Sequence, residues 1–321
     1  MSSTPPETLV RPLTGVAELP LFNRLSYVLD HELEDDFAAG RRRPEWTWVA
    51  LSGDRLLARL AWWTKPGRAE PMFLDFFDLD DALPEAERVE VGVRLLETAS
   101  AAVLKGGPRP EYGRFVPADW RDDPAARAAV TARMTAAERT GARLLVERLR
   151  LEWNPAVAAV PAASGRLRFR PVVDREDLVA LMALVMAGTL DAHGLADLAS
   201  GLSPREAAEQ HYDEEFAGYS SPREWWRVAE LPDSGEPVGF VVPAHNGYNA
   251  TIAYIGVLPA HRGHGYIDDV LAEGTRILAA EDVPRVRAAT DLANVPMARA
   301  FARAGYVNFE RAIDMTWDAL P

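Results

Sequence analysis

The chain has 321 residues, 48% of them hydrophobic and 26% charged, so it can bury sizeable cores, and its length favours two domains of about 150 residues. Cysteine is absent, which excludes disulfides, a thiolate nucleophile and cysteine-ligated zinc, and we expect no metal. A formal net charge of −13 disfavours nucleic acid as a partner, because phosphate backbones bind clustered Lys and Arg.

The first residues, MSSTPPETLVRPL, contain no basic segment followed by an apolar one. The longest apolar run, residues 178–187, is too short to span a bilayer. We therefore expect a cytoplasmic protein without a membrane partner. Its oligomeric state is expected to be a monomer or a homodimer.

In the N-terminal half, residues 72–79 are predicted to form a strand and residues 86–104 a helix. The segment between them reads DDALPEAER and has no glycine. Carboxylates in this segment would oppose an anion at the start of the helix; they are Asp80, Asp81, Glu85 and Glu87. We expect this half to be a structural partner that holds no phosphate-bearing ligand.

An internal repeat indicates two similar domains. The block AERTGARLLVERLRLEW at residues 137–153 resembles FARAGYVNFERAIDMTW at residues 301–317, with the same spacing of 12 positions from Gly to Trp. LVRPL at residues 9–13 is echoed by FRPVV at residues 169–173. The prolines and small residues of 154–165 are typical of a connector, so we expect domains at 1–155 and 166–321, divided near residue 160.

The C-terminal half begins with a predicted strand at residues 167–172, followed by a helix that Asp174 opens. The polar stretch around residues 191–215 is expected to form short helices that contact an acceptor. A hairpin is predicted from residues 225–231 and 237–242, across the turn Pro-Asp-Ser-Gly.

The apolar run at residues 251–258 predicts a buried strand, which leads through a glycine-rich turn into a helix. Polar residues of this helix are expected on its outer face; they are Asp268, Asp269, Glu273 and Arg276. A strand at 286–289, a helix capped by Asn294 and ended by Gly305, and a final strand pair at 306–317 complete a mixed α/β domain.

The segment VLPAHRGHGYI, residues 257–267, places glycines between a buried strand and the first turn of a helix. Unpaired N–H groups at a helix start bind anions, and glycines allow close approach, so a pyrophosphate is the expected ligand. The alternative is a tight structural turn in which Arg262 is only a surface charge. The segment is neither a Walker A loop nor a dinucleotide fingerprint, because neither spacing is present.

Here the chain resembles the GNAT superfamily of N-acetyltransferases, whose signature joins a strand ending in V-x-P to RxxGxG or RxxGxA and a helix. The residues that match this signature are Arg262, Gly263, His264, Gly265 and Tyr266. The family's second pattern, an Asn leading a short helix that ends in Gly and an aromatic residue, is matched by Asn294, Met297, Gly305 and Tyr306. The resemblance covers residues 166–321 and is faint in the N-terminal half.

The resemblance implies a mixed α/β (α+β) fold of two GNAT-like domains, each a mixed, mostly antiparallel sheet flanked by helices. Residues 1–155 would be a degenerate copy, and residues 166–321 would bind acyl-coenzyme A, with acetyl-CoA as cosubstrate. Backbone groups of four strand residues would hold the pantetheine; they are Ile255, Gly256, Val257 and Leu258. Six residues would cradle the pyrophosphate; they are Arg262, Gly263, His264, Gly265, Tyr266 and Ile267.

The same resemblance puts Asn294 and Phe301 near the thiol. The sequence departs from the family at two positions. Ile267 replaces the last Gly or Ala of the signature, which would alter phosphate contact. Phe301 stands where many relatives carry a tyrosine that protonates the departing thiolate, and a phenyl ring cannot act as an acid.

Acyl transfer to an amine needs a deprotonated amine and a polarised thioester carbonyl, for which the backbone N–H near Val257 is a candidate. The candidate bases are Asp291, His245 and Tyr254, which border strand ends. The alternatives are a turn-stabilising aspartate, an exposed loop histidine and a core tyrosine, with water relaying the proton.

The leading hypothesis is an N-acetyltransferase that acts on the amine of a small molecule by direct attack in a ternary complex. Carboxylates within residues 191–215 would favour a cationic acceptor. The first rival is a non-catalytic protein that binds or senses acyl-CoA, suggested by Phe301. The second rival is an aminoacyl-tRNA-dependent transferase, which the acidic net charge opposes.

Overall fold

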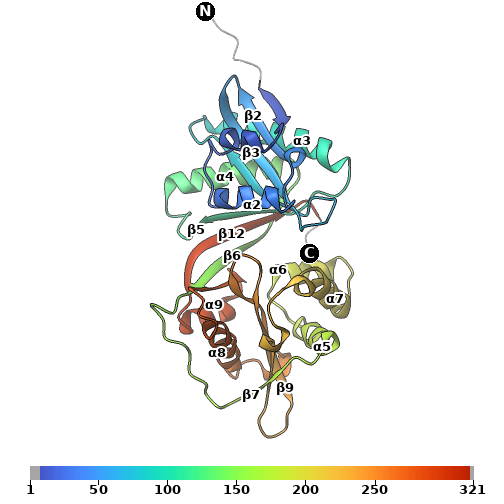
Figure 1. The fold of residues 1–321 in the computed structure, drawn as a ribbon, viewed down its shortest axis with the longest axis vertical. Coiled ribbons are helices and arrows are strands. Elements are labelled where there is room, and N and C mark those ends of the chain that lie inside the picture. The colour runs from blue at the N-terminus through green and yellow to red at the C-terminus, as the bar shows by residue number, and fades with distance from the viewer. Residues whose placement is uncertain (1–7, 319–321) are drawn as a thin grey trace, which may run out of the picture. The chain divides into compact units, whose positions relative to one another are not determined.

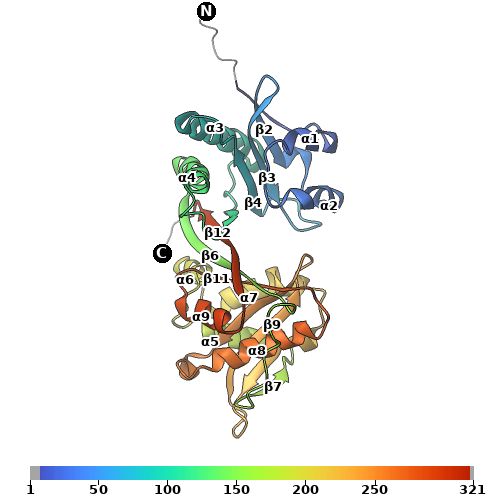
Figure 2. The same ribbon diagram turned by 90° about the vertical axis from the view of Figure 1, so that its left-hand side faces the viewer.

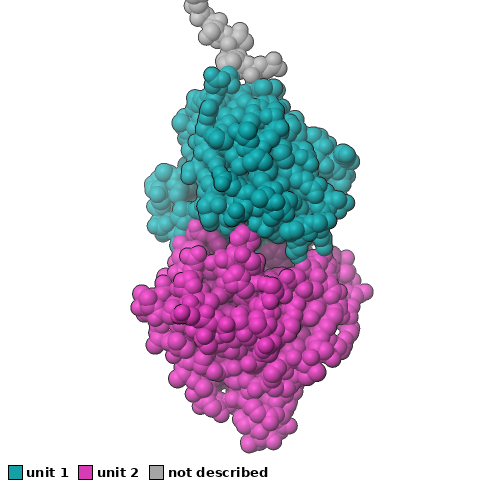
Figure 3. Space-filling model, viewed as in Figure 1, with its two compact units in different colours: residues 1–146, 312–319 teal, residues 147–311, 320–321 magenta. Residues whose placement is uncertain are grey.

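The computed structural model describes residues 8–318, which form two compact units (Figures 1 and 3). Of these residues, unit 1 contains 8–146 and 312–318, and unit 2 contains 147–311. The chain passes from unit 1 to unit 2 within one strand, after Val146, and returns within another, after Arg311. None of the helices in the described part of the chain has the length and apolar composition needed to cross a membrane.

The sheet of unit 1 runs in the order β1-β2-β3-β4-β5, followed by the C-terminal end of β12. Helices α1 and α2 cover one face and α3 and α4 the other (Figure 2). The first four strands pair antiparallel, and β4 pairs with β5 in parallel. The elements are β1 (Leu9–Pro12), α1 (Leu19–Phe22), α2 (Leu33–Ala38), β2 (Thr47–Ser52), β3 (Arg55–Trp63), β4 (Phe73–Leu79), α3 (Glu85–Leu104), β5 (Tyr112–Pro117), α4 (Pro124–Arg139) and β12 (Val307–Thr316).

The sheet of unit 2 runs in the order β6-β11-β10-β9-β8-β7. Helices α8 and α9 cover one face, and α5, α6 and α7 lie on the other (Figures 1 and 2). All neighbouring pairs are antiparallel except β10 with β11. The elements are β6 (Arg143–Trp153), β7 (Arg168–Pro171), α5 (Arg175–Val185), α6 (Ala192–Ala199), α7 (Pro204–Glu214), β8 (Arg227–Glu230), β9 (Pro237–His245), β10 (Ala250–Val257), the 3-10 turn η6 (Pro259–His261), α8 (Tyr266–Ala279), β11 (Val286–Asp291) and α9 (Val295–Arg303).

The two units repeat the same local structure, which confirms the tandem arrangement. Arg11 follows Val10 in the first strand of unit 1, donates to the carbonyl of Pro12 and pairs with Glu18 seven positions on. Arg170 in the first strand of unit 2 makes the same bonds, to the carbonyl of Pro171 and to Asp177, again seven positions on. The mixed α/β architecture expected for each half is likewise confirmed.

The compact units differ from two contiguous repeats in one respect, because β6 and β12 each have one end in each unit. Trp153, at the end of β6, is fully buried and packs in the core of unit 2 with Phe301. Ile313 and Met315, near the end of β12, pack in the core of unit 1. Each repeat thus contributes the end of its last strand to the core of the other unit.

Two details of the C-terminal half differ from expectation. Residues 307–316 form one strand, β12, and not a strand pair. Asp269 and Glu273 are buried and do not lie on the outer face of α8, and each is paired with at least one arginine. Their partners are Arg166 for Asp269 and Arg227 and Arg276 for Glu273.

Candidate functional site

Unit 2 contains a cavity of about 480 Å³, a volume typical of small-molecule sites. It extends from the glycine-rich turn before α8, along β10, to the loop between α5 and α6 and the start of α9. Its wall includes Arg148, Val185, Gly188, Thr189, Leu190, Asp191, Tyr254, Ile255, Gly256, Val257, His261, Arg262, Gly263, Gly265, Tyr266, Ile267, Thr290, Asn294, Met297 and Phe301.

The cavity exists because β10 and β11 separate. Their register contains one pair of residues, Thr251 with Arg287. On its other side β10 pairs with β9 along its length, with a bulge between Ile252 and Tyr254. Beyond Thr251, the edge of β10 that faces β11 therefore has backbone N–H and C=O groups without a strand partner.

The glycine turn brings backbone N–H groups to one end of this cavity. Gly263 and Gly265 have φ angles of +82° and +73°, which side chains of L-residues rarely allow. Gly265 is the N-cap of α8, and no side chain caps its N–H groups. The first N–H groups of a helix have no partner within the helix and carry its positive dipole end, so this turn can receive an anion.

Two carboxylates in the first turn of α8 would oppose an anion, and each is paired with an arginine. Asp268 contacts Arg303 with an N–O distance of 2.6 Å. Asp269 pairs with Arg166, which also donates to the carbonyl oxygens of His264 and Gly265, at 3.2 and 3.1 Å. These pairings reduce the negative field at the turn.

The side chain of Arg262 is neither an unattached surface charge nor aimed at the glycine turn. Its three nitrogens donate to backbone carbonyls, with Nε bound to Val257 at 3.1 Å and Nη2 to Val185 at 2.7 Å. Nη1 binds Ala187 at 2.7 Å and Gly188 at 3.2 Å. The guanidinium therefore ties the turn to the C-terminal end of α5.

Asn294 caps α9, as expected, by accepting a hydrogen bond from the N–H of Met297 at 3.3 Å. Phe301 is 1% exposed, lines the cavity, and meets Tyr306 edge-on with 5.0 Å between ring centroids. The Tyr306 hydroxyl lies 2.8 Å from that of Thr275, away from the wall of the cavity. Tyr306 therefore does not supply the cavity with the phenol that Phe301 lacks.

Tyr254 is the candidate base that lines the cavity. Its ring stacks on Phe240, with centroids 5.4 Å apart. Burial raises the pKa of its phenol, and the nearby carboxylates of Asp191 and Asp197 raise this pKa further. The phenol therefore stays protonated at neutral pH, where it can donate a hydrogen bond but cannot act as a base.

The other two candidate bases are not part of the cavity wall. Asp291 is 2% exposed and is bound to Arg148 and to the N–H of Ala192. Burial raises the pKa of its carboxyl group, and Asp191 adds to the shift. His245 lies at the end of β9, where its N–H donates to Ser221 and its ring accepts from the N–H of Gly247.

Of the residues expected to bind the cofactor, Leu258 and His264 are absent from the wall. Leu258 is buried, and its N–H donates to the carbonyl of Val238 at 2.8 Å. The structure adds Arg148, Asp191 and His261 to the wall. Arg148 was not predicted as a site residue, because the predicted domain began at residue 166. Asp191 belongs to the polar stretch that was expected to contact an acceptor.

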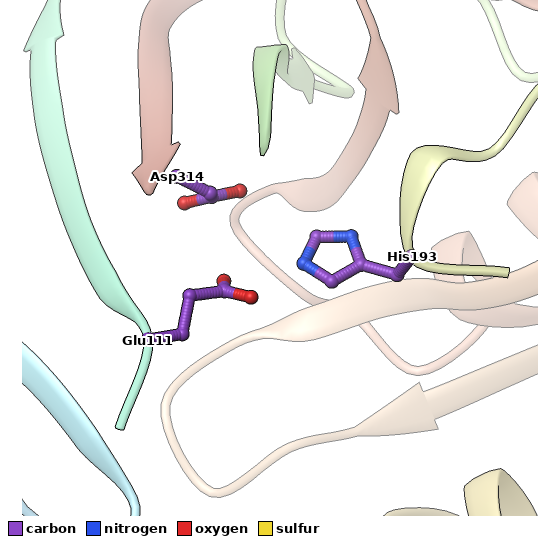
Figure 4. Close-up of side chains that lie close together, drawn as sticks. All are labelled: Glu111, His193 and Asp314. Carbon is purple, nitrogen blue, oxygen red and sulfur yellow. The ribbon is translucent and has the colours of Figure 1, made fainter. Parts of the chain in front are cut away.

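In the corresponding region of unit 1, a phenyl ring lies beside strand β5. β4 and β5 also share one register pair, Leu74 with Tyr112, but a Cβ on Gly113 would lie 2.2 Å from the ring of Phe73. Asp314 of β12 lies against the same glycine, and Figure 4 shows it together with Glu111, the residue before β5.

Residues 166–307 match the family model described as an acetyltransferase (GNAT) domain. The search of curated proteins found no match.

Solved structures share the fold over nearly the whole chain. A GCN5-related N-acetyltransferase from Sphaerobacter thermophilus has 16% identity and a TM-score of 0.61, over 99% of this chain and 98% of that one. A tandem GNAT protein from the clavulanic acid biosynthesis pathway has 17% identity and a TM-score of 0.55, over 98% of this chain and 100% of that one. These likenesses establish the fold.

Proposed function

We propose that the protein transfers an acetyl or related acyl group from coenzyme A to the amine of a small-molecule acceptor, because residues 166–307 match the model of an acetyltransferase (GNAT) domain. The amine attacks the thioester directly in a ternary complex. The observation that carries this proposal is the cavity of unit 2, which joins an anion-receiving helix start to the open edge of a strand.

The residues present fit coenzyme A. Its pyrophosphate would lie on the N–H groups from Gly263 to Ile267, where the α8 carboxylates are already paired with arginines. The pantetheine, an amide chain, would bond to the open edge of β10 at Ile255, Gly256 and Val257. The acyl thioester would then reach the part of the cavity lined by Asn294 and Phe301.

In the reaction, a bond forms between the amine nitrogen and the acyl carbon, and the carbon–sulfur bond breaks. A backbone N–H of β10 near Val257 polarises the carbonyl oxygen. The departing sulfur needs a proton, and Tyr254 is the proposed donor because it lines the cavity and its phenol is protonated at neutral pH. The amine proton leaves through water.

The acceptor end of the cavity favours a cationic amine. Asp191 lines the wall, with one oxygen bound to the N–H of Gly194 at 2.8 Å. Asp197, on the same helix, has a raised pKa, chiefly because of burial. An acceptor that carries a positive charge beside its reacting amine would be attracted by both carboxylates.

The test is thiol release on mixing the protein with acetyl-CoA and a panel of mono- and diamines. We expect turnover, with diamines giving the higher kcat/KM. A second candidate function is binding of acyl-CoA without transfer. It is favoured by Phe301, which stands where many relatives carry a tyrosine that protonates the thiolate. Tight binding of acetyl-CoA with no thiol release from any amine would support that function and contradict the transferase.

A further inference from the structure

The loop between α5 and α6 forms one wall of the cavity, through Gly188, Thr189, Leu190 and Asp191. We call residues 187–192 the strap. Gly188 has a φ of +66°, and the Thr189 hydroxyl accepts the N–H of Asp191 at 3.1 Å. Asp191 then caps α6. The strap is therefore a short, shaped segment whose two ends are held by side chains from other elements.

Arg262 holds the first end. Its guanidinium donates to the carbonyls of Val185, Ala187 and Gly188, which are the last groups of α5 and the first of the strap. Carbonyls at the end of a helix have no partner within it, and a cation there also meets the negative end of the helix dipole. This one side chain therefore closes α5 and fixes the start of the strap.

Asp291 holds the second end. Its Oδ2 accepts the N–H of Ala192 at 2.7 Å, and its Oδ1 accepts Nε of Arg148 at 3.1 Å. The carboxylate is 2% exposed, and each of its oxygens makes one of these contacts within unit 2. A carboxylate held in this way, outside the cavity wall, is poorly placed to take a proton from an acceptor.

We propose that Arg262 and Asp291 are positioning residues that hold the strap as the acceptor-side wall of the cavity, and that Arg262 does not bind the phosphates of coenzyme A through its side chain. The inference rests on the proposed function for its kinetic consequence. Its structural consequence, the order of residues 187–192, can be measured without any substrate.

The first test compares wild type with Arg262→Met and Arg262→Lys. Hydrogen exchange at residues 187–192 is expected to accelerate in the Met variant, and less so in the Lys variant, which keeps a donor. The KM for the amine should rise about tenfold or more in the Met variant, while the Kd for coenzyme A measured by calorimetry changes by less than about threefold.

The opposite pattern would overturn the proposal: a Kd for coenzyme A weakened about tenfold with unchanged exchange in the strap would assign Arg262 to the phosphates. If the Met variant does not fold, the Lys variant decides by the same two measurements. Absence of coenzyme A binding in wild type would refute the proposed function, whereas unchanged strap exchange in both variants would refute this inference alone.

The second test compares Asp291→Asn with Asp291→Ala. Asparagine keeps an oxygen that can accept the N–H of Ala192, so a positioning role predicts that strap exchange and kcat stay near wild type for Asn and are both altered for Ala. A general base predicts that both variants lose kcat equally and that the acidic limb of the pH–rate profile disappears. That second result would overturn the proposal and identify Asp291 as the general base.

Discussion

Among single residues, Tyr254 connects the cavity to the proposed chemistry, because it lines the wall and its phenol stays protonated. We predict that Tyr254→Phe lowers kcat about 10- to 100-fold, since a proton donor is lost while the ring and its stacking on Phe240 remain. The Kd for coenzyme A should not change.

The matched control is Tyr212→Phe, which makes the same chemical change in unit 2 at a residue that packs on Trp226 and is not in the cavity wall. Steady-state kinetics with acetyl-CoA and the best amine give the comparison. Equal kcat values for Tyr254→Phe and wild type would remove Tyr254 from the mechanism.

Glu18 provides a prediction about pH. Hydrogen bonds from Arg11, and then from Thr14, lower the pKa of its carboxyl group from 4.5 to about 2. A carboxyl whose pKa falls on folding stabilises the protein above its unfolded pKa and loses this effect as the pH falls through the folded value. Wild type should therefore be more stable than Glu18→Gln at pH 7, and the gap should shrink between pH 4.5 and about 2.

Urea unfolding of both proteins across this pH range measures the gap. A gap that is already absent at pH 7, or that does not change with pH, would contradict the ion pair. The pair recurs as Arg170 with Asp177, whose pKa is also lowered, so unit 2 offers an internal repetition of the experiment.

At the level of elements, α8 can approach the sheet of unit 2 closely because position 274 has no side chain. A Cβ there would lie 2.7 Å from Val241 and 2.9 Å from Ile252. We predict that Gly274→Ala destabilises the protein by about 1–3 kcal/mol, although alanine favours helix, because the added methyl overpacks the core.

The control is Gly218→Ala, where a Cβ would meet nothing within 4 Å. Thermal or urea unfolding should show little change for this variant. If Gly274→Ala were as stable as Gly218→Ala, the close packing of α8 on β9 and β10 would be wrong.

The local elements around the site could be predicted from the sequence, because they depend on neighbouring residues. The caps Asp174 and Asn294 and the apolar run of β10 are such features, and all three are confirmed. The contacts of Arg262 with Val185, Ala187 and Gly188 could not be predicted, because these partners lie 74 to 77 positions away. The buried Asp269 was misassigned for the same reason, since Arg166 lies 103 positions away.

For the whole molecule, the exchanged strand ends determine which core a substitution in β6 or β12 destabilises. Two contiguous repeats would give the opposite result. Met315 belongs to the second repeat but packs in the core of unit 1, and Leu151 belongs to the first repeat but packs in the core of unit 2. Each, replaced by alanine, should cost about 2–5 kcal/mol. Hydrogen exchange should accelerate in α3 and α4 for Met315→Ala, and in α8 and α9 for Leu151→Ala.

If Met315→Ala instead accelerated hydrogen exchange in α8 and α9, the assignment of the strand ends to the two cores would be wrong. The duplication itself could be predicted from the repeated block that ends at Trp153 and Trp317. Alternation along β6 and β12 indicates which residues are buried, but it does not indicate which of two similar cores contains them. The exchange of strand ends between the units could therefore not be predicted from the sequence.

The central claim is that the glycine turn of unit 2, and not the glycine-free segment 80–88 of unit 1, receives the phosphates of coenzyme A. Calorimetry of coenzyme A with wild type, Gly265→Val and Gly247→Val tests it most directly, because Gly247 has a similar positive φ of +91° in a hairpin turn outside the cavity wall. We predict one coenzyme A per chain, weakened about tenfold or more by the change at 265 and unaffected by the change at 247. Undiminished binding to Gly265→Val, two molecules per chain, or no binding to wild type would contradict the account.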